Sequence, residues 1–169
     1  AYTITDKLSL FMIRDEKEIP GFFEKQLEQL GVDYVDYYWL HGLNAQTYRQ
    51  AEEMHAFDFI QTKKDEGKIH HIGLSFHDKA ELLDEILTVH PELEYVQIQL
   101  NYLDWNDPAV ESRLCYEVAV KHHKPVIVME PVKGGSLIQI PVPAKDLFEK
   151  AHPELSVASW AIRFAASPS

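Results

Sequence analysis

Hydrophobic positions follow two different spacings along the chain, and their alternation predicts a fold of parallel strands and helices. Short apolar runs rich in Val, Ile and Tyr are typical of strands. Five such runs occur, at Tyr2–Leu8, Val35–His41, Ile69–Phe76, Tyr95–Leu100 and Pro125–Met129. Longer segments with apolar residues every three or four positions lie between and after them, as in amphipathic helices. They predict helices at about Pro20–Leu30, Ala45–Glu66, from Asp78 to before Pro91, from Asp107 to His123, Ala144–Ala151 and Val157–Ala166.

Local signals at the ends of these segments support the predicted helices. Pro20 suits the first helical position, and Gly31 suits the left-handed residue that follows a helix. Asp78 followed by Glu81 resembles a capping box. Asp107–Pro108 reads as a helix cap followed by a first-turn proline. We therefore expect helices that start at Asp78 and at Asp107.

Strict alternation of strand and helix requires parallel strands joined by crossover helices. Two architectures fit this pattern, an open doubly wound sheet and a (β/α)₈ TIM barrel. A complete barrel needs about 250 residues, whereas this chain has 169 and begins inside a predicted strand. We therefore expect an α/β fold, a partial TIM barrel of about five consecutive β/α units, as a single incomplete domain over residues 1–169. An incomplete barrel would leave strand edges unpaired, so we expect marginal stability unless oligomerisation or further chain covers them.

The chain is acidic, and this excludes two classes of partner. Lysine and arginine number 16 against 27 aspartate and glutamate residues, which gives a formal net charge of −11. Nucleic acids and anionic membranes attract clustered positive charge, so neither is an expected partner. Cys115 is the only cysteine, which excludes an intrachain disulfide framework. With no apolar run near 20 residues and no signal peptide, we expect a cytoplasmic protein.

Polar residues gather where the predicted strands end, which is the face of a barrel that carries active sites. These residues are Lys7, His41, Ser75–His77, Gln97–Asn101 and Met129–Gly135. A histidine at the position of His41 can donate a hydrogen bond to a carbonyl oxygen that gains negative charge; alternatively, backbone groups satisfy its ring. The charge of Lys7 can lower the pKa of a neighbouring acid, although most strand-end lysines are simply solvated.

The last predicted strand is followed by Pro131, Val132, Lys133 and the pair Gly134–Gly135. Paired glycines let backbone N–H groups approach an anion such as a phosphate, but they are also common in plain turns. The sequence holds neither a GxGxxG nor a Walker motif. Its nine histidines are not joined by cysteines or acidic residues at ligand spacing, so we expect no metal site.

Four motifs in order make the sequence similar to the aldo-keto reductase family of NADP-dependent (β/α)₈ oxidoreductases. The matching stretches are Leu30–Asp36 leading into Leu40–His41, Glu66–Ile69 running to Ile72–Ser75, Val96–Tyr102, and Pro125–Pro131 with the glycine pair. The Met-Glu-Pro and Ser-Phe-His variants resemble a bacterial subgroup whose members often carry a downstream iron–sulfur region. The resemblance therefore implies that any such cluster lies in parts of the parent protein outside this chain.

The resemblance implies a mechanism in which hydride passes between the nicotinamide and a carbonyl carbon while a tyrosine protonates the oxygen. It makes His41 the histidine that orients the substrate and Lys7 the lysine that tunes the tyrosine. The tyrosine and its partner aspartate would lie upstream of Ala1. We expect the parent protein to be an NADP(H)-dependent enzyme acting on a small-molecule carbonyl, and this chain alone to be inactive.

The resemblance also implies cofactor contacts. Ser75 and Gln97 match positions that hold the nicotinamide carboxamide, and Met129 stands where many relatives stack a tyrosine on the ring. Phe76 replaces an asparagine that usually helps to bind the carboxamide. Pro131, Gly134 and Gly135 match the pyrophosphate side.

Two other functions remain open at this point. One is a non-catalytic regulatory subunit that senses nicotinamide nucleotides, although the presence of both His41 and Lys7 favours an enzyme. The other is an unrelated phosphate-binding TIM-barrel isomerase or lyase, and only the glycine pair supports it. Nothing in the sequence decides the oligomeric state.

Overall fold

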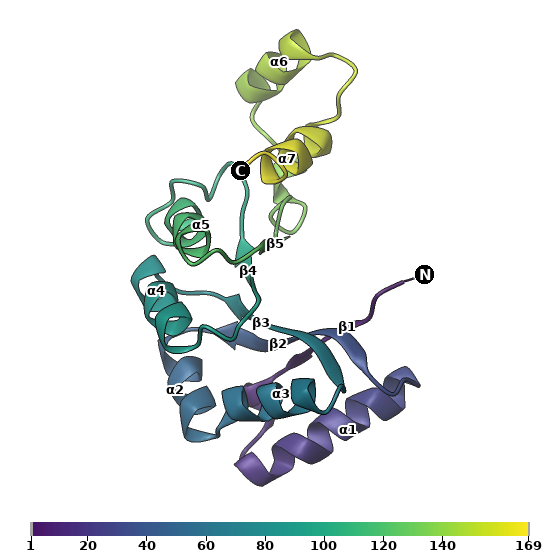
Figure 1. The fold of residues 1–169 in the computed structure, drawn as a ribbon. Helices are drawn as coiled ribbons and strands as arrows, with labels where there is room; N and C mark the ends of the chain where they lie inside the picture. Colours follow the sequence, from purple (N-terminus) through teal and green to yellow (C-terminus); the bar gives the residue numbers. More distant parts are fainter. Residues whose placement is uncertain (1, 169) are drawn as a thin grey trace.

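The computed structural model describes residues 2–168 and contains one parallel five-stranded sheet (Figure 1). Its strands are β1 (Thr5–Leu8), β2 (Val35–Leu43), β3 (Ile69–Phe76), β4 (Tyr95–Gln99) and β5 (Val126–Met129). Every strand pairs with the next one along the chain. A doubly wound sheet reverses its strand order at a switch point, and this sheet does not. The order β1-β2-β3-β4-β5 is that of consecutive units of a (β/α)₈ barrel, which confirms the predicted partial barrel. The terminal residues of the expected domain, 1 and 169, lie outside the described residues.

Seven α-helices are described, and most agree with the predicted segments. They are α1 (Ile19–Leu30), α2 (Ala45–Glu53), α3 (Ala56–Asp65), α4 (Ala80–Val89), α5 (Ser112–Lys121), α6 (Val142–Ala151) and α7 (Val157–Ala165). Short 3₁₀ helices cover Leu10–Met12, Glu16–Glu18 and Ser136–Ile138. As expected, Pro20 lies in the first turn of α1, and Gly31 ends that helix with a φ of 68°.

The single helix predicted over Ala45–Glu66 is wrong, because the segment forms α2 and α3 with a break between them. His55 adopts a φ of 50°, which lies in the left-handed region and cannot continue a right-handed helix. Ala51 near the end of α2 and Ala56 at the start of α3 are both fully buried. The corner therefore brings two small side chains into the core that a straight helix would not bury together.

Two predicted helix starts are also wrong. Helix α4 begins at Ala80 with Lys79 as its N-cap and no side-chain cap. The carboxylate of Asp78 instead accepts hydrogen bonds from the backbone N–H groups of Ala45 and Lys79, each at 2.8 Å. Asp107 accepts from the N–H of Ala109 at 2.7 Å, which makes a local turn, and α5 begins only at Ser112. In both places the aspartate side chain bonds to backbone N–H groups outside the helix that it was predicted to cap, and Asp78 bonds to the first residue of α2 instead.

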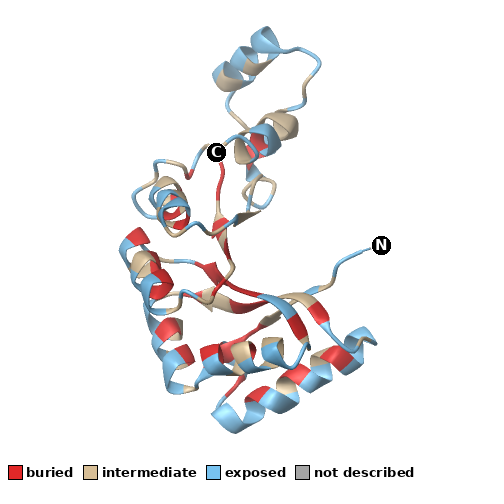
Figure 2. Cartoon of the chain, in the orientation of Figure 1, coloured by how far each residue is buried: buried red, intermediate tan, exposed pale blue. Residues whose placement is uncertain are grey.

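The two faces of the sheet differ in character. Side chains that alternate along the strands pack against the helices and form the apolar core. This core joins strand residues such as Leu8, Leu40, Leu74 and Val96 to helix residues such as Phe23, Ile60 and Leu83. Figure 2 shows the buried residues concentrated in β2–β4 and in the helices that cover them. The opposite face carries the polar and aromatic residues that the next subsection describes.

The segment after β5 is packed far less tightly. Helix α6 buries none of its residues, and Val142 and Leu147 on it are 69% and 67% exposed. Figure 1 shows α6 lying far from the sheet, with α7 between α6 and β5. Phe148 of α6 stacks on Trp160 of α7 with ring centroids 5.1 Å apart, whereas α7 also contacts the loop after β4 through Phe164.

Candidate active site

The strand register brings one row of side chains onto the face of the sheet away from the helices. Lys7 pairs with Trp39, Trp39 with Gly73, and Gly73 with Tyr95. Partners in register on neighbouring strands point to the same face of a sheet. Trp39 and Tyr95 contact each other edge to face at 5.4 Å and are only 5% and 4% exposed. They form an apolar floor beneath the polar strand ends.

Gly73 makes this floor possible. A Cβ atom at this position would lie 2.5 Å from Cε2 of Tyr95 and 2.6 Å from the carbonyl oxygen of Tyr95. Side-chain carbons do not approach other atoms so closely. Glycine is therefore required here by the close approach of its neighbour, since its backbone needs no unusual conformation.

Lys7 lies above the floor and connects the first strand to the fourth. Its Nζ donates a hydrogen bond to Oε1 of Gln97 at 3.0 Å and lies 5.1 Å from the centre of the Trp39 ring. Burial lowers the pKa of Lys7, and the nearby carboxylate of Asp6 opposes that shift. The cation–π contact with Trp39 and the hydrogen bond to Gln97 together hold the Lys7 ammonium in place.

The contact with Lys7 also orients Gln97. An ammonium group can only donate hydrogen bonds, so the carbonyl oxygen of the Gln97 amide must face Lys7. The NH₂ group of Gln97 then points elsewhere and keeps its donors for another acceptor. That Gln97 holds an amide-bearing ligand stays a prediction.

His41 lies near the end of β2 and is held by the segment after β1. Its Nδ1 is 2.6 Å from the hydroxyl of Ser9, and the ring of Phe11 packs against it at 5.4 Å. Burial lowers the pKa of His41, and the positive charges of Lys7 and His77 lower it further. The imidazole is therefore neutral at neutral pH, which is the form that can donate one proton in a hydrogen bond without carrying a charge.

Ser75 lies in the same layer but is fully buried. It pairs in register with Gln97, and its hydroxyl accepts a hydrogen bond from the N–H of Gly42 at 2.8 Å. Gly42 follows His41 and has a φ of 69°. The immediate effect of Ser75 is thus to hold the turn after His41, and contact with a ligand would require the groups that cover Ser75 to move.

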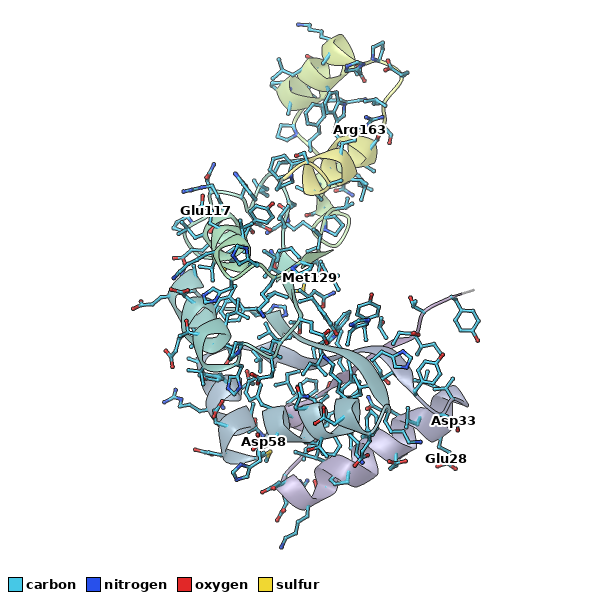
Figure 3. All side chains as sticks on the ribbon, viewed as in Figure 1. Glu28, Asp33, Asp58, Glu117, Met129 and Arg163 are labelled. Atoms are coloured by element: carbon cyan, nitrogen blue, oxygen red, sulfur yellow. The ribbon has the colours of Figure 1, made fainter. Side chains whose placement is uncertain are left out.

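The residues after β5 lie beside the fourth strand rather than beside Lys7. Met129, labelled in Figure 3, pairs in register with Gln99 at the end of β5. Gly134 and Gly135 have φ values of 60° and 88°, which a turn requires. Three backbone N–H groups of this loop, those of Lys133, Gly135 and Ser136, already donate to carbonyls within the loop. The loop containing Pro131 is therefore closed by its own turns, and fewer N–H groups than expected are free for an anion.

One buried cluster was not predicted from the sequence. Asp104 is 1% exposed, and its carboxylate accepts hydrogen bonds from Lys133 at 2.5 Å, Gln99 at 2.6 Å and Asn101 at 2.7 Å. Asn101 is fully buried and also donates to the carbonyl of Glu130 at 3.0 Å. These bonds tie the loop after β4 to the loop after β5.

His77, which the sequence places among the strand-end residues of this face, is coupled electrostatically to Lys7 and His41 in the structure. It follows β3 on the Ser-Phe-His stretch, and its pKa is lowered by burial and by the charge of Lys7. Lys7, His41 and His77 are thus close enough to influence one another's charge. Across residues 2–168, no three His, Cys, Asp or Glu side chains are grouped in a way that could hold a metal ion. None of the described helices is both long and apolar enough to span a membrane.

Comparisons with known proteins agree with the fold. The sequence model described as the aldo/keto reductase family matches residues 14–161, whereas a search of curated proteins found no match. The fold is similar to an aldo/keto reductase from Klebsiella pneumoniae in complex with NADP and acetate, with a TM-score of 0.64 and 18% identity over 92% of this chain and 53% of that chain.

Two further solved structures show the same likeness. The holo form of an aldo-keto reductase from Bacillus halodurans gives a TM-score of 0.67 and 19% identity over 95% of this chain and 57% of that one. An aldo/keto reductase from Brucella melitensis gives 0.67 and 23% over 94% and 56%. The chain therefore spans about half the length of the structures it matches.

Proposed function

The chain belongs to the aldo/keto reductase family, and from this we propose that its sheet carries part of the active site of an oxidoreductase. The proposed reaction moves a hydride between NADP(H) and a carbonyl or alcohol substrate. The observation that carries this proposal is the hydrogen bond of 3.0 Å between Lys7 and Gln97, 90 positions apart in the sequence, on the face where His41 also lies. The proposed substrate is a small molecule, and a relative from Klebsiella was solved with NADP and acetate.

His41 is the proposed hydrogen-bond donor to the substrate oxygen. Its imidazole is kept neutral by burial and by the positive charge of Lys7, both of which lower its pKa, and protonation of His77 lowers it further. A neutral donor stabilises negative charge that develops on a carbonyl oxygen and does not compete for a proton. Lys7 is proposed to favour the ionised form of an acid beside it through its charge, in the role that the family resemblance implies.

The donor groups on this face suit a nicotinamide carboxamide. Gln97 presents its NH₂ group because Lys7 occupies its carbonyl oxygen. The hydroxyl of Ser75 accepts from Gly42 and keeps its own proton for donation. Met129 at the end of β5 is the proposed apolar contact for the nicotinamide ring, and Pro131, Gly134 and Gly135 are proposed to lie against the pyrophosphate. A bound NADPH would supply the hydride.

The fold supports a proposal about the chain by itself. We propose that residues 1–169 form one incomplete barrel domain, since the solved aldo/keto reductases that match it are nearly twice as long. β1 and β5 are the edges of the described sheet, so nothing described closes the mouth around Lys7 and His41. Reaction in an open mouth would lack the exclusion of water that such sites need. The 169-residue chain is therefore proposed to be inactive alone.

We propose a cytoplasmic location and no iron–sulfur cluster in this chain. A cytoplasmic, bacterial reductase fits an acidic chain with one free, buried cysteine. Cys115 is no candidate ligand for an iron–sulfur cluster, because burial and the nearby Glu111 and Asp78 carboxylates raise the pKa of its thiol to about 12. A cluster needs thiolates. Any such cluster is proposed to lie outside this chain.

Cofactor binding by the 169-residue chain can be tested by fluorescence titration with NADPH. We expect Gln97→Ala to weaken binding about tenfold, because a lost hydrogen bond of about 1.4 kcal/mol has that effect. Gln61→Ala on α3, where Gln61 bonds only to Asp65 among the described residues, is the matched control and should bind as the original chain does. Binding of inorganic phosphate without any binding of NADPH would instead favour the isomerase or lyase.

Catalysis needs a second experiment. In any longer chain that contains residues 1–169 and a closed barrel, we expect NADPH-dependent reduction of a panel of aldehydes. His41→Ala should lower kcat about 10²-fold, as general acid–base and oxyanion donors commonly do. NADPH binding without turnover in that longer chain would favour the regulatory subunit.

A further inference from the structure

Ser9 and His41 are in direct contact across the first two strands. The Ser9 hydroxyl oxygen lies 2.6 Å from Nδ1 of the His41 ring. Ser9 directly follows β1 and is only 9% exposed, while His41 is near the end of β2. This is a short, well-shielded hydrogen bond on the face that carries the candidate site.

Chemistry decides which of the two groups donates. A neutral imidazole carries one proton, either on Nδ1 or on Nε2, and a serine hydroxyl carries one of its own. Within residues 2–168, the Ser9 hydroxyl has one hydrogen-bond partner, Nδ1 of His41. If Nδ1 were protonated, the hydroxyl would accept and its own proton would be buried without an acceptor, at a cost of about 1–3 kcal/mol. Donation from Ser9 to Nδ1 avoids this cost.

The surroundings keep Ser9 in position for that donation. The Ser9 carbonyl accepts from the N–H of Met12 at 3.0 Å, which closes a turn of 3₁₀ helix. Gln50 on α2 donates to the carbonyl of Leu10 at 3.2 Å and ties the same turn to the helix layer. Phe11 in that turn packs against the His41 ring at 5.4 Å. The 3₁₀ turn, helix α2 and the Phe11 ring thus hold Ser9 in contact with His41.

From these contacts we propose that Ser9 is a positioning residue that holds His41 in the tautomer with its proton on Nε2. Among the described residues, Nε2 of His41 has no hydrogen-bond partner, so its proton is free for a ligand. If the proposed reductase function holds, this tautomer presents a donor to the substrate oxygen. The other tautomer would present a lone pair and repel it. Ser9 acts on the reaction only through His41.

The tautomer can be measured without turnover, by NMR of the ring nitrogens in the ¹⁵N-labelled 169-residue chain. The spectrum is recorded well above the ordinary histidine pKa of about 6.5, and loss of one signal set in His41→Gln identifies His41. We expect Nδ1 to resonate as an unprotonated nitrogen and Nε2 as a protonated one. In Ser9→Ala we expect the Nδ1 resonance to move toward the protonated value as both tautomers become populated.

Two variants serve as controls. Ser9→Thr keeps the hydroxyl and should restore the original spectrum. Ser112→Ala removes another buried hydroxyl, which bonds to the carbonyl of Gln99 at 2.7 Å, and should leave the His41 signals unchanged. A protonated Nδ1 in the original chain, or a Ser9→Ala spectrum identical to it, would overturn the inference.

The outcome for Ser9 is separable from the outcome for the reductase. If Ser9→Ala does not fold, the spectrum of the original chain alone still decides the tautomer. If the Nε2–H tautomer is found but NADPH titration shows no binding, the inference about Ser9 stands and the reductase function falls. The reverse result leaves the function standing and removes Ser9 as its positioning residue.

Discussion

Lys133 and Asp104 join the loops that follow the last two strands, with Nζ and Oδ1 2.5 Å apart. The carboxylate is almost completely buried, at 1% exposed, whereas the lysine side chain is 35% exposed. Gln99 and Asn101 complete the set of donors around it. A buried carboxylate is tolerated only when its charge is paired and its oxygens are hydrogen-bonded. This pair therefore fixes the position of the glycine-containing loop relative to the fourth strand.

Replacing Asp104 with Asn should destabilise the chain by about 1–3 kcal/mol. Removing one partner of a fully buried pair costs about 3–5 kcal/mol, and the partial exposure of Lys133 reduces that figure. Urea unfolding followed by circular dichroism measures the change. Asp146→Asn on the exposed side of α6 is the matched control and should change the free energy of unfolding much less. Equal effects of the two variants would show that the buried pair of Asp104 and Lys133 does not contribute to the free energy of unfolding.

The contribution of Asp104 should also depend on pH. Burial by itself raises the pKa of this carboxyl, but the hydrogen bonds from Lys133, Gln99 and Asn101 outweigh burial and lower the pKa overall. A folded-state pKa below the unfolded value of about 3.9 means that the unfolded chain binds protons first as pH falls. The stabilisation is then complete above that value and is lost on acidification.

Measuring urea unfolding of the original chain and of Asp104→Asn from about pH 7 to pH 3 isolates this group. The difference between the two free energies of unfolding should be constant near neutrality and should shrink as pH falls through the unfolded pKa. Other carboxylates with lowered pKa, such as Asp84 and Glu94, affect both chains alike. A difference that does not change over this range would contradict the prediction.

Gly73→Ala should destabilise the sheet by about 1–3 kcal/mol, the usual cost of overpacking. The added Cβ would lie 2.6 Å from the backbone oxygen of Tyr95, which cannot move without shifting a strand. Gly21→Ala in α1 is a matched control, since a Cβ there meets nothing within 4 Å. In that helix we expect a gain of about 0.5–1 kcal/mol. A neutral Gly73→Ala would mean that Tyr95 is free to move aside.

The strands could be predicted from the sequence because each is short, apolar and rich in β-branched and aromatic residues. Ile69–Phe76 was predicted with the same bounds as β3, and the other four strands differ by up to three residues at an end. The break at His55 could not be predicted, because apolar spacing continues across it. The left-handed conformation of His55 is set by the packing of the two helices, and the helix propensity of the sequence does not indicate it.

The candidate site could be predicted in part. Parallel strands place their carboxyl ends at one edge, and this rule alone brought Lys7, His41, Ser75 and Gln97 to the same face. Ser9 lies two residues after Lys7, so the period of a strand gave a signal that it shares this face. Its contact with His41 depends on the register of β1 and β2, which the sequence does not state. The bond from Lys133 to Asp104 joins two loops and follows no local pattern.

The contacts of Tyr102 and Trp105 could not be predicted from strand or helix spacing, because both residues lie in the loop after β4. Tyr102 contacts Phe148 and Phe164 of the last two helices, and Trp105 contacts Phe164 and Tyr116. The loop therefore packs against α5 and α7, and this direction is set by contacts between distant residues rather than by a local pattern.

The pKa of His41 should rise when Lys7 is replaced by Met. Burial lowers this pKa first, and the positive charges of Lys7 and His77 lower it further, because a second positive charge nearby is unfavourable. The pKa of His77 is likewise lowered by burial and by Lys7, so both histidines should respond to Lys7→Met. NMR titration of the His41 and His77 ring protons gives both values directly. Lys17→Met, at an exposed position in the 3₁₀ helix Glu16–Glu18, is the matched control and should leave both unchanged.

Lys7→Met should also change how the stability of the chain depends on pH. A histidine with a folded-state pKa below its unfolded value of about 6.5 binds more protons when unfolded, so stability falls as pH drops through that value. In Lys7→Met the folded-state pKa moves back toward the unfolded one, and the loss of stability between neutral and mildly acidic pH should become smaller. Added salt should weaken the effect of Lys7, because the ammonium acts through space and ions screen it. Unchanged His41 and His77 titrations in Lys7→Met would mean that burial alone sets both values and that Lys7 does not share their site.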